Sequence, residues 1–369
     1  MFGRPWGEAV AEEVTRIGAQ RIFVLAAATL ATNIGLESQV HAALSDRLAG
    51  FATGIRGHAP RADVIAATDR VRASGADFIL AIGGGSVIDA AKIVSLCIAA
   101  NVHDAEHLGT LAASRHKPLP ENLPVRIAAI PTTLSGAEFT HFAGATDTQR
   151  QIKEAYAHPF MVPRFVVLDA AITVPTPRRI WLSTGIRALD HAVESICSVS
   201  ANPLSDATAI HSLKLLVSGL PLSTDAPNDM QARLDCLNGV WLSAVGLQSG
   251  VPMGASHGIG HALGGTAGVP HGETSCVMLA HVLRWNKSAN AERQLTVSAA
   301  MGDVSVDAGD LVGRLVAGLG LPTRLRDVGV LRGQFAQIAS TAFRDPWTQA
   351  NPRPIESVDT IVDLLEAAW

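Results

Sequence analysis

Cysteine and long hydrophobic runs are scarce in this chain of 369 residues. The few cysteines stand far apart and form no CxxC pair, which predicts reduced, mostly buried thiols rather than a disulfide framework or a zinc cluster. They are Cys97, Cys197, Cys236 and Cys276. No stretch approaches the roughly 18 consecutive apolar residues that a membrane-spanning helix needs.

Charge is also limited: charged residues make up 17% of the chain, and the net charge is −4. They form no basic run and do not alternate with aromatic residues, so nucleic acid is not an expected partner. The N-terminus lacks the basic start and apolar core of a signal peptide. We therefore expect a soluble cytoplasmic protein that binds neither nucleic acid nor a membrane.

The chain is long enough, at 48% hydrophobic residues, to form two domains. Short apolar runs predict strands at 21–29, 77–86, 125–133 and 164–170, and residues 61–76 have helical spacing. This alternation predicts a doubly wound parallel sheet, an α/β architecture. After the Pro-rich stretch at 175–177, amphipathic helical patterns continue to Trp369 with almost no strand signal. We expect domains at 1–174 (α/β) and 175–369 (all-α).

Two polar loops follow predicted strands. In "AIGGGSVIDAAK" (81–92) the glycines let backbone N–H groups approach an anion at a helix N-terminus. The alternative is a tight strand–helix turn, and the usual GxGxxG fingerprint is absent. The second loop, "PTTLSGAE" (131–138), offers the hydroxyls of Thr132, Thr133 and Ser135. Both loops fall at carboxyl ends of strands, where such sheets bind ligands, so together they favour a dinucleotide site.

Histidines gather in "SHGIGHALGGTAGVPHGE" (256–273). His257 and His261 share one helix face, and His271 follows in a Pro-His-Gly turn. His191 lies upstream in "TGIRALDHAVES" (184–195), close to Arg187. The pattern is not HExxH, which argues against a zinc protease. Each histidine alone is compatible with a packed core position, but the group favours a functional site.

These motifs, in this order over nearly the whole chain, resemble the iron-containing alcohol dehydrogenase superfamily. Three further features are similar to its maleylacetate reductase branch: "GIRGHAP" around His58, "TLSGAE" with Glu138, and "ANPRPI" followed by "LLEAAW". The resemblance implies an α/β dinucleotide-binding domain, a helical catalytic domain, an active site in the cleft between them, and a homodimer.

The resemblance also assigns roles to residues. The cofactor pyrophosphate would lie against the glycine motif, and the second loop would line the nicotinamide side. The implied cofactor-binding residues are Gly83, Gly84, Gly85, Ser86, Asp89, Thr132, Thr133 and Ser135. In metal-dependent members one Asp and three His bind the ion, and the histidine positions match His191, His257 and His271. His261 matches a histidine near the nicotinamide that takes part in proton transfer.

The aspartate position of that metal set holds Arg187 instead. A guanidinium has no lone pair for a metal and would repel a dication. We therefore expect a metal-free site in which Arg187 binds a substrate carboxylate or polarises the carbonyl; the alternative is an outward-facing surface ion pair. Asp190 is expected to point elsewhere on the helix. If a metal were bound, His191, His257 and His271 would be its ligands.

The resemblance implies an NADH- or NADPH-dependent reductase that converts maleylacetate, a small dicarboxylate, to 3-oxoadipate in aromatic catabolism. The expected catalytic residues are His261, His257, His191, His271 and Arg187, with His261 or His257 delivering the proton. His58 and Arg353 are further candidates for the carboxylates, although Arg353 also suits a structural clamp. No acid follows the first strand, where Ala26–Ala28 stand, so either cofactor is compatible. The alternatives are a related oxidoreductase acting on another small acidic carbonyl, enone or alcohol, and a non-catalytic cofactor-binding protein.

Overall fold

The computed structural model describes residues 1–150 and 152–369. The chain forms two compact units, a first unit of residues 1–133 and 137–176 and a second unit of residues 134–136 and 177–369. The division thus follows Thr176, inside the Pro-rich stretch. Residues 134–136 join the second unit, where the backbone N–H of Leu134 donates to the hydroxyl of Thr184 at 3.0 Å.

The first unit is built on a four-stranded parallel sheet with the order β2-β1-β3-β4. Its strands are β1 (Ile22–Ala26), β2 (Leu48–Ala52), β3 (Phe78–Gly83) and β4 (Arg126–Pro131). Every residue of β1 and β3 is buried. Continuous apolar strands of this kind are what a parallel sheet covered on both faces requires.

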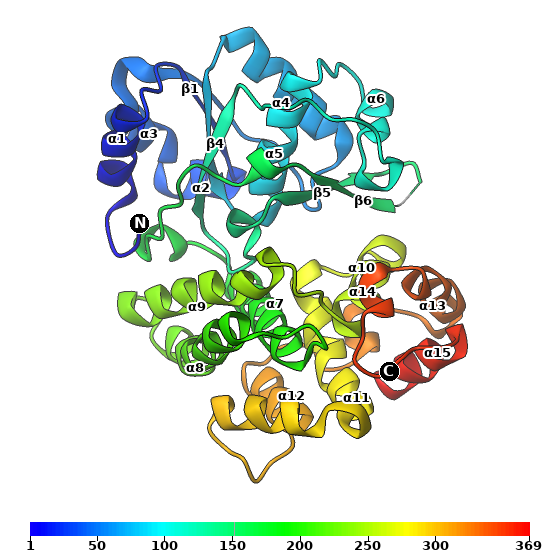
Figure 1. The fold of residues 1–369 in the computed structure, drawn as a ribbon. Helices are drawn as coiled ribbons and strands as arrows, with labels where there is room; N and C mark the ends of the chain where they lie inside the picture. The colour runs from blue at the N-terminus through cyan, green and yellow to red at the C-terminus, as the bar shows by residue number, and fades with distance from the viewer. Residues whose placement is uncertain (151) are drawn as a thin grey trace. The chain divides into compact units, whose positions relative to one another are not determined.

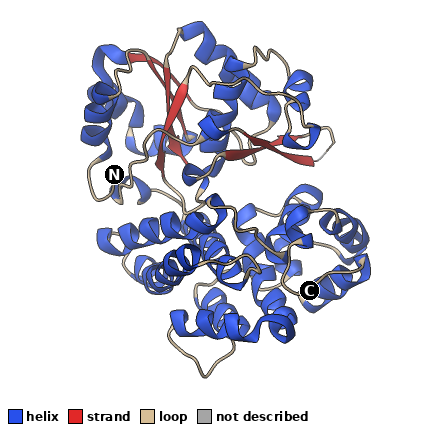
Figure 2. Ribbon diagram, viewed as in Figure 1, coloured by secondary structure: helices blue, strands red, loops and turns tan. Residues whose placement is uncertain are grey.

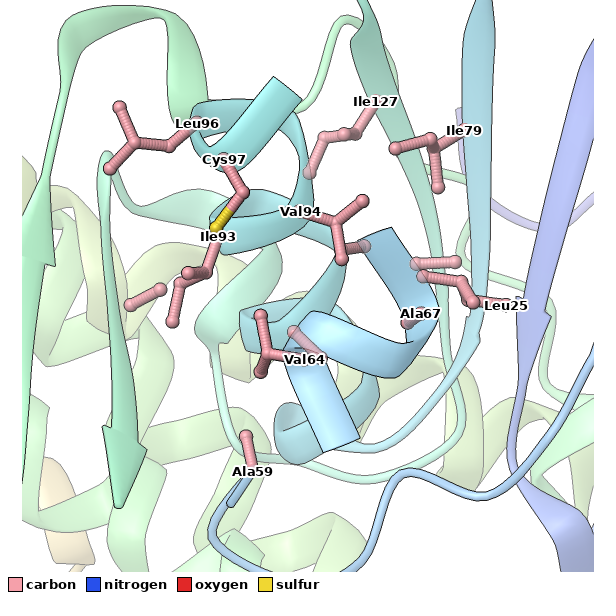
Figure 3. Packing of buried hydrophobic residues seen from close by; sticks show 14 of the residues in the cluster. Leu25, Ala59, Val64, Ala67, Ile79, Ile93, Val94, Leu96, Cys97 and Ile127 are labelled. Atoms are coloured by element: carbon pink, nitrogen blue, oxygen red, sulfur yellow. The ribbon is translucent and has the colours of Figure 1, made fainter. Parts of the chain in front are cut away.

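Helices cover both faces of this sheet (Figure 1). They are α1 (Trp6–Arg16), α2 (Ala28–Ile34), α3 (Leu36–Leu44), α4 (Arg61–Ser74), α5 (Gly85–Ala99) and the short α6 (Ala105–Thr110). Successive side chains of a strand point to opposite faces. Ile79 therefore packs with α4 and α5, in the cluster around Cys97 shown in Figure 3, whereas Leu80 packs with α1, α2 and α3.

The structure differs from the strand predictions in three places. The expected strand at 164–170 forms only isolated bridges, Val166 with Ala129 and Leu168 with Phe2. An antiparallel pair, β5 (Phe142–Asp147) and β6 (Ile152–Ala157), was not expected. These two strands are short and mixed in polarity, so they lack the continuous apolar run that marks a buried strand. The edge strand β2 was also missed, and its residues are mostly half-buried.

The strand order places a topological switch between β1 and β3, because the chain passes from β1 to β2 on one side and then to β3 on the other. Doubly wound sheets bind ligands at the carboxyl ends of strands beside such a point. The glycine motif lies there, since β3 ends at Gly83 and α5 begins at Gly85.

The second unit is helical, and its described residues contain no strand (Figure 2). Its helices are α7 (Arg178–Cys197), α8 (Pro203–Asp225), α9 (Met230–Gln248), α10 (Ala255–Ala267), α11 (His271–Met301), α12 (Ala308–Gly318), α13 (Phe335–Phe343), α14 (Pro346–Gln349) and α15 (Val358–Ala367). Among the described residues, no helix combines the length and the hydropathy needed to cross a membrane. All four cysteines are buried free thiols, as expected from the sequence.

Candidate active site

Three helices of the second unit bring the predicted catalytic side chains together. Arg187 and His191 lie one turn apart on α7, and positions four apart share a helix face. His257 and His261 repeat this spacing on α10, and His271 is the first residue of α11. The helices α7, α10 and α11 pack against one another.

Arg187 is buried, with 2% of its surface exposed. Its Nη1 donates to the hydroxyl of Ser275 at 3.1 Å, and its Nε has no hydrogen-bond partner. Within residues 1–150 and 152–369, no carboxylate forms an ion pair with it. Burial lowers the pKa of the guanidinium to about 10, although nearby carboxylates, first that of Asp190, act in the opposite direction. The alternative of a surface ion pair is therefore wrong. The guanidinium of Arg187 is a buried cation whose Nε has no hydrogen-bond partner.

Contrary to the expectation from the sequence, Asp190 points towards the histidines. Its Oδ2 accepts hydrogen bonds from the hydroxyls of Ser256 at 2.7 Å and Ser275 at 2.6 Å, and lies 3.6 Å from Nδ1 of His257. The expectation fails because residue 190 is three positions after Arg187, which returns it to the same face of α7. Asp190 and Arg187 thus share Ser275 as a hydrogen-bonding neighbour.

Glu194 is a functional-site residue that the sequence reasoning missed. Its Oε2 accepts the backbone N–H of Gly254 at 2.8 Å and lies 2.7 Å from Nδ1 of His257, and its Oε1 accepts the N–H of Ser256 at 2.9 Å. It therefore caps the start of α10, which has no side-chain cap of its own. Burial raises the pKa of Glu194, and Asp190 raises it further. The sequence signal that could have identified Glu194 is its position three residues after His191, which places both on one face of a helix.

His191 and His257 stack on each other, with ring centroids 4.7 Å apart. Nδ1 of His191 and Nε2 of His257 are buried and have no hydrogen-bond partner. Burial and the positive charge of Arg187 lower the pKa of His191 to about 3 and that of His257 well below its usual value. Both rings are therefore neutral near pH 7, and each has one buried polar nitrogen available to a ligand.

His261 and His271 form a second, more exposed pair of rings, stacked with centroids 5.9 Å apart. Nδ1 of His261 lies 2.8 Å from Oδ2 of Asp345. The indole of Trp347 covers His261 at 4.9 Å and meets the edge of His257 at 5.6 Å. Asp345 lies 84 residues after His261 in the sequence, and the sequence reasoning assigned neither Asp345 nor Trp347 to the site.

The donor set does not fit the four-ligand ion that the resemblance implies. Three positions hold histidines, but Arg187 stands at the fourth, buried and within electrostatic reach of His191 and His257. Its fixed positive charge opposes a dication and its nitrogens cannot coordinate one.

A different trio, Asp190, Glu194 and His257, brings its possible ligand atoms within 4.8 Å of one another. Hydrogen bonds engage several atoms of this cluster: His257 contacts Glu194, Glu194 accepts two backbone N–H groups, and Asp190 accepts two hydroxyls. Oδ1 of Asp190 and Nε2 of His257 are buried without a hydrogen-bond partner. Arg187 lies within electrostatic reach of Asp190, Glu194 and His257, so its positive charge opposes a dication at this trio as well.

The predicted cofactor residues of the first unit do fit a dinucleotide. No side chain caps the N-terminus of α5, so its first N–H groups remain for an anion. A Cβ on Gly84 would come within 2.9 Å of the Thr133 side chain, so this approach requires glycine. The N–H of Thr132 bonds to the carbonyl of Gly83 at 3.0 Å, which joins the two loops. The buried hydroxyl of Thr133 has no partner.

Two of the other predicted residues around this loop, Ser86 and Asp89, have hydrogen-bond partners in the first unit. The hydroxyl of Ser86 accepts the backbone N–H of His58 at 3.1 Å, so His58 lies beside the glycine motif. Asp89 accepts the N–H of Gly144 at 3.1 Å, and burial raises its pKa. Gly85 is the first residue of α5. Ser135 belongs to the segment that joins the second unit, and its buried hydroxyl has no partner.

Arg353 has contacts that match the alternative of a structural clamp. Its Nη1 donates to the carbonyl of Trp285 at 2.8 Å, and the guanidinium lies over that indole ring, 4.2 Å from its centroid. Its own carbonyl accepts from the side chain of Asn351 at 2.7 Å. These bonds hold the C-terminal segment on α11. Among the described residues, no hydrogen bond or ion pair joins Arg353 to a predicted catalytic histidine.

Comparison with known proteins agrees with this architecture. A model of the iron-containing alcohol dehydrogenase family matches residues 1–170, and a model of the C-terminal part of that family matches residues 181–369. Dehydrogenase FUM7 of Gibberella moniliformis is 34% identical over 100% of this chain and 95% of its own. Maleylacetate reductase 1 of Cupriavidus pinatubonensis is 32% identical over 100% of this chain and 94% of its own.

Among solved structures, maleylacetate reductase from Agrobacterium tumefaciens has a TM-score of 0.84 to this chain at 29% identity, over 100% of this chain and 95% of that one. Its fold, like the family models, spans both units. This chain therefore belongs to the iron-containing alcohol dehydrogenase family and is an oxidoreductase.

Proposed function

We propose that this oxidoreductase reduces maleylacetate to 3-oxoadipate with NADH or NADPH, and that it needs no metal ion. The observation that carries the proposal is the buried guanidinium of Arg187 at the position of the family's metal-binding aspartate. The similarity to maleylacetate reductases supports the choice of substrate.

The buried cation has a chemical use in this reaction. When bound, a nicotinamide cofactor supplies the hydride that reduces the double bond conjugated with the ketone of maleylacetate. Negative charge then develops on the ketone oxygen. Arg187, which has one hydroxyl partner and an unpaired Nε, is suited to stabilise that oxygen or a substrate carboxylate. A preorganised positive charge in a low-dielectric site stabilises a developing negative charge more strongly than the same charge does in water.

The reaction ends with a proton on the carbon next to the ketone. His191 and His257 are neutral near pH 7 and deeply buried, so they suit hydrogen bonding. His261 is more exposed, at 35% of its side chain, and bonded to a carboxylate. We assign His261 as the proton donor, since imidazole exchanges protons near neutral pH.

The test is reduction of maleylacetate by the chelator-treated protein, followed through NADH and NADPH absorbance. We expect turnover without added metal. Arg187→Ala should lower kcat/KM about 10²- to 10³-fold, the range for loss of one oxyanion donor. Arg284→Ala is the matched control, because Arg284 forms an exposed ion pair with Asp310 and should leave activity unchanged.

Two outcomes would contradict the proposal. Activity that appears only on addition of iron or zinc would show that Arg187 does not replace the ion. Metal-free turnover of another acidic enone or carbonyl, but not of maleylacetate, would keep the role of Arg187 and change the substrate, so a panel of such compounds belongs in the same assay.

A further inference from the structure

The segment from Asp345 to Asn351 packs on α10, the helix that carries two of the histidines. The side-chain oxygen of Asn351 accepts the N–H of Ala255 at 3.1 Å, at the first residue of that helix. In the middle of the contact a Cβ on Gly258 would come within 2.1 Å of the Thr348 hydroxyl. The absence of a side chain there lets the segment lie directly against the histidine-bearing helix.

Asp345 uses its two carboxylate oxygens for different purposes. Oδ1 accepts the backbone N–H of Trp347 at 2.9 Å and so caps α14. Oδ2 accepts from Nδ1 of His261 at 2.8 Å. Asp345 thus links the position of the segment to that of the imidazole, because the carboxylate that caps α14 through Oδ1 also meets the ring through Oδ2.

The bond to Asp345 also decides which nitrogen of His261 carries hydrogen. A carboxylate is an acceptor, so Nδ1 of the neutral ring must be the N–H, and protons are exchanged at Nε2. Trp347 lies against the ring face, 4.9 Å between centroids, and His271 stacks on it. These aromatic contacts oppose rotation of the imidazole.

We propose that Asp345 is a positioning residue that fixes the tautomer and orientation of His261, so that proton transfer to the substrate carbon takes place through Nε2. This rests on the proposed function to the extent that His261 is taken as the proton donor. Asp345 acts through His261.

Asp345→Asn is the sharpest test. Asparagine is as good a helix cap as aspartate, so α14 and the fold should persist. Its amide N–H₂ would face His261 as a donor, which places the ring hydrogen on Nε2 instead. We expect kcat to fall about 10²- to 10⁴-fold, with little change in the KM for NADH. The solvent isotope effect in D₂O should rise, because proton transfer becomes rate-limiting.

Asp229→Asn is the matched control. Asp229 caps α9 in the same unit by accepting the N–H of Ala232 at 3.0 Å. This variant makes the same chemical change at a cap away from the histidines, and it should keep kcat and the isotope effect of the wild type. Asp345→Ser is a second variant that retains a hydroxyl cap but is too short to reach His261; kcat should fall here too.

Nitrogen-15 NMR of labelled histidine measures the tautomer without any substrate. We expect hydrogen on Nδ1 of His261 in the wild type and on Nε2 in Asp345→Asn. Hydrogen on Nε2 in the wild type, or a kcat in Asp345→Asn within twofold of the wild type, would overturn the inference. If the wild type reduces no acidic enone, the proposed function fails, and the NMR result still decides whether Asp345 sets the tautomer.

Discussion

Glu138 is buried in the first unit with 1% of its surface exposed, and neither carboxylate oxygen has a hydrogen-bond partner. Burial raises its pKa from 4.5 to about 7. The folded state thus holds the proton more tightly than the unfolded chain, so the stability that this group contributes is complete below pH 4.5 and is lost as the pH rises towards 7.

Glu138→Gln should therefore be increasingly stabilising, relative to the wild type, as the pH rises. The amide keeps the shape and does not ionise. The difference in free energy of unfolding between the two proteins should grow between pH 5 and pH 8 by on the order of 3 kcal/mol, from the shift of the pKa to about 7. Urea unfolding at several pH values measures it. A constant difference across this range would mean that Glu138 ionises normally in the folded protein.

At the scale of the element, α10 is held by residues outside itself. Glu194 and Asn351 accept the first N–H groups of the helix, and α14 lies against its glycine face. The intrinsic preference of a glycine-rich helix is low. Tertiary contacts therefore decide both where α10 begins and how its histidines are presented.

Replacement of two glycines of α10 by alanine should change the stability of the protein in opposite directions. In Gly258→Ala the new Cβ would come 2.7 Å from the backbone N of Thr348, so we expect a loss of about 1–3 kcal/mol from overpacking and reduced turnover as α14 shifts. Gly264→Ala meets only the Val269 carbonyl, at 3.6 Å, and should gain up to about 1 kcal/mol. Thermal unfolding compares the two. A higher melting temperature in Gly258→Ala than in the wild type would contradict the prediction, because it would mean that α14 moves away from the new Cβ without destabilising the protein.

At the scale of the whole molecule, the candidate cofactor loop and the buried Arg187 belong to different units. A ligand that binds only the folded state stabilises it in proportion to its saturation, by about 2.7 kcal/mol at one hundred times Kd. NADH or NADPH should therefore raise the melting temperature of the wild type and, by a similar amount, that of Arg187→Ala.

Gly84→Ala should reduce that ligand-induced rise, because its Cβ would meet Thr133 at the anion-binding turn. The measurement is the melting temperature with and without cofactor. A rise that survives in Gly84→Ala, or that disappears in Arg187→Ala, would contradict this division of roles between the units.

The sequence by itself determined the parallel-sheet strands with continuous apolar runs, β1, β3 and β4, the glycine motif after β3, and the helical second half. It also located the histidines, and the resemblance to the family implied that Arg187 stands where metal-dependent members have an aspartate. These features are local: periodicity, chain turns and residue chemistry operate over a few positions. The mixed strands β5 and β6 escaped prediction because their pairing, rather than their composition, makes them strands.

Only the tertiary structure decided what surrounds those side chains. Arg187 is buried instead of exposed, Asp190 turns towards His257, and the partners Glu194 and Asp345 come from 63 and 84 residues away from the histidines they contact. Such hydrogen bonds depend on distances of about 3 Å between atoms that sequence separation does not constrain. Helix packing sets those distances, and with them the charge and tautomer of each group.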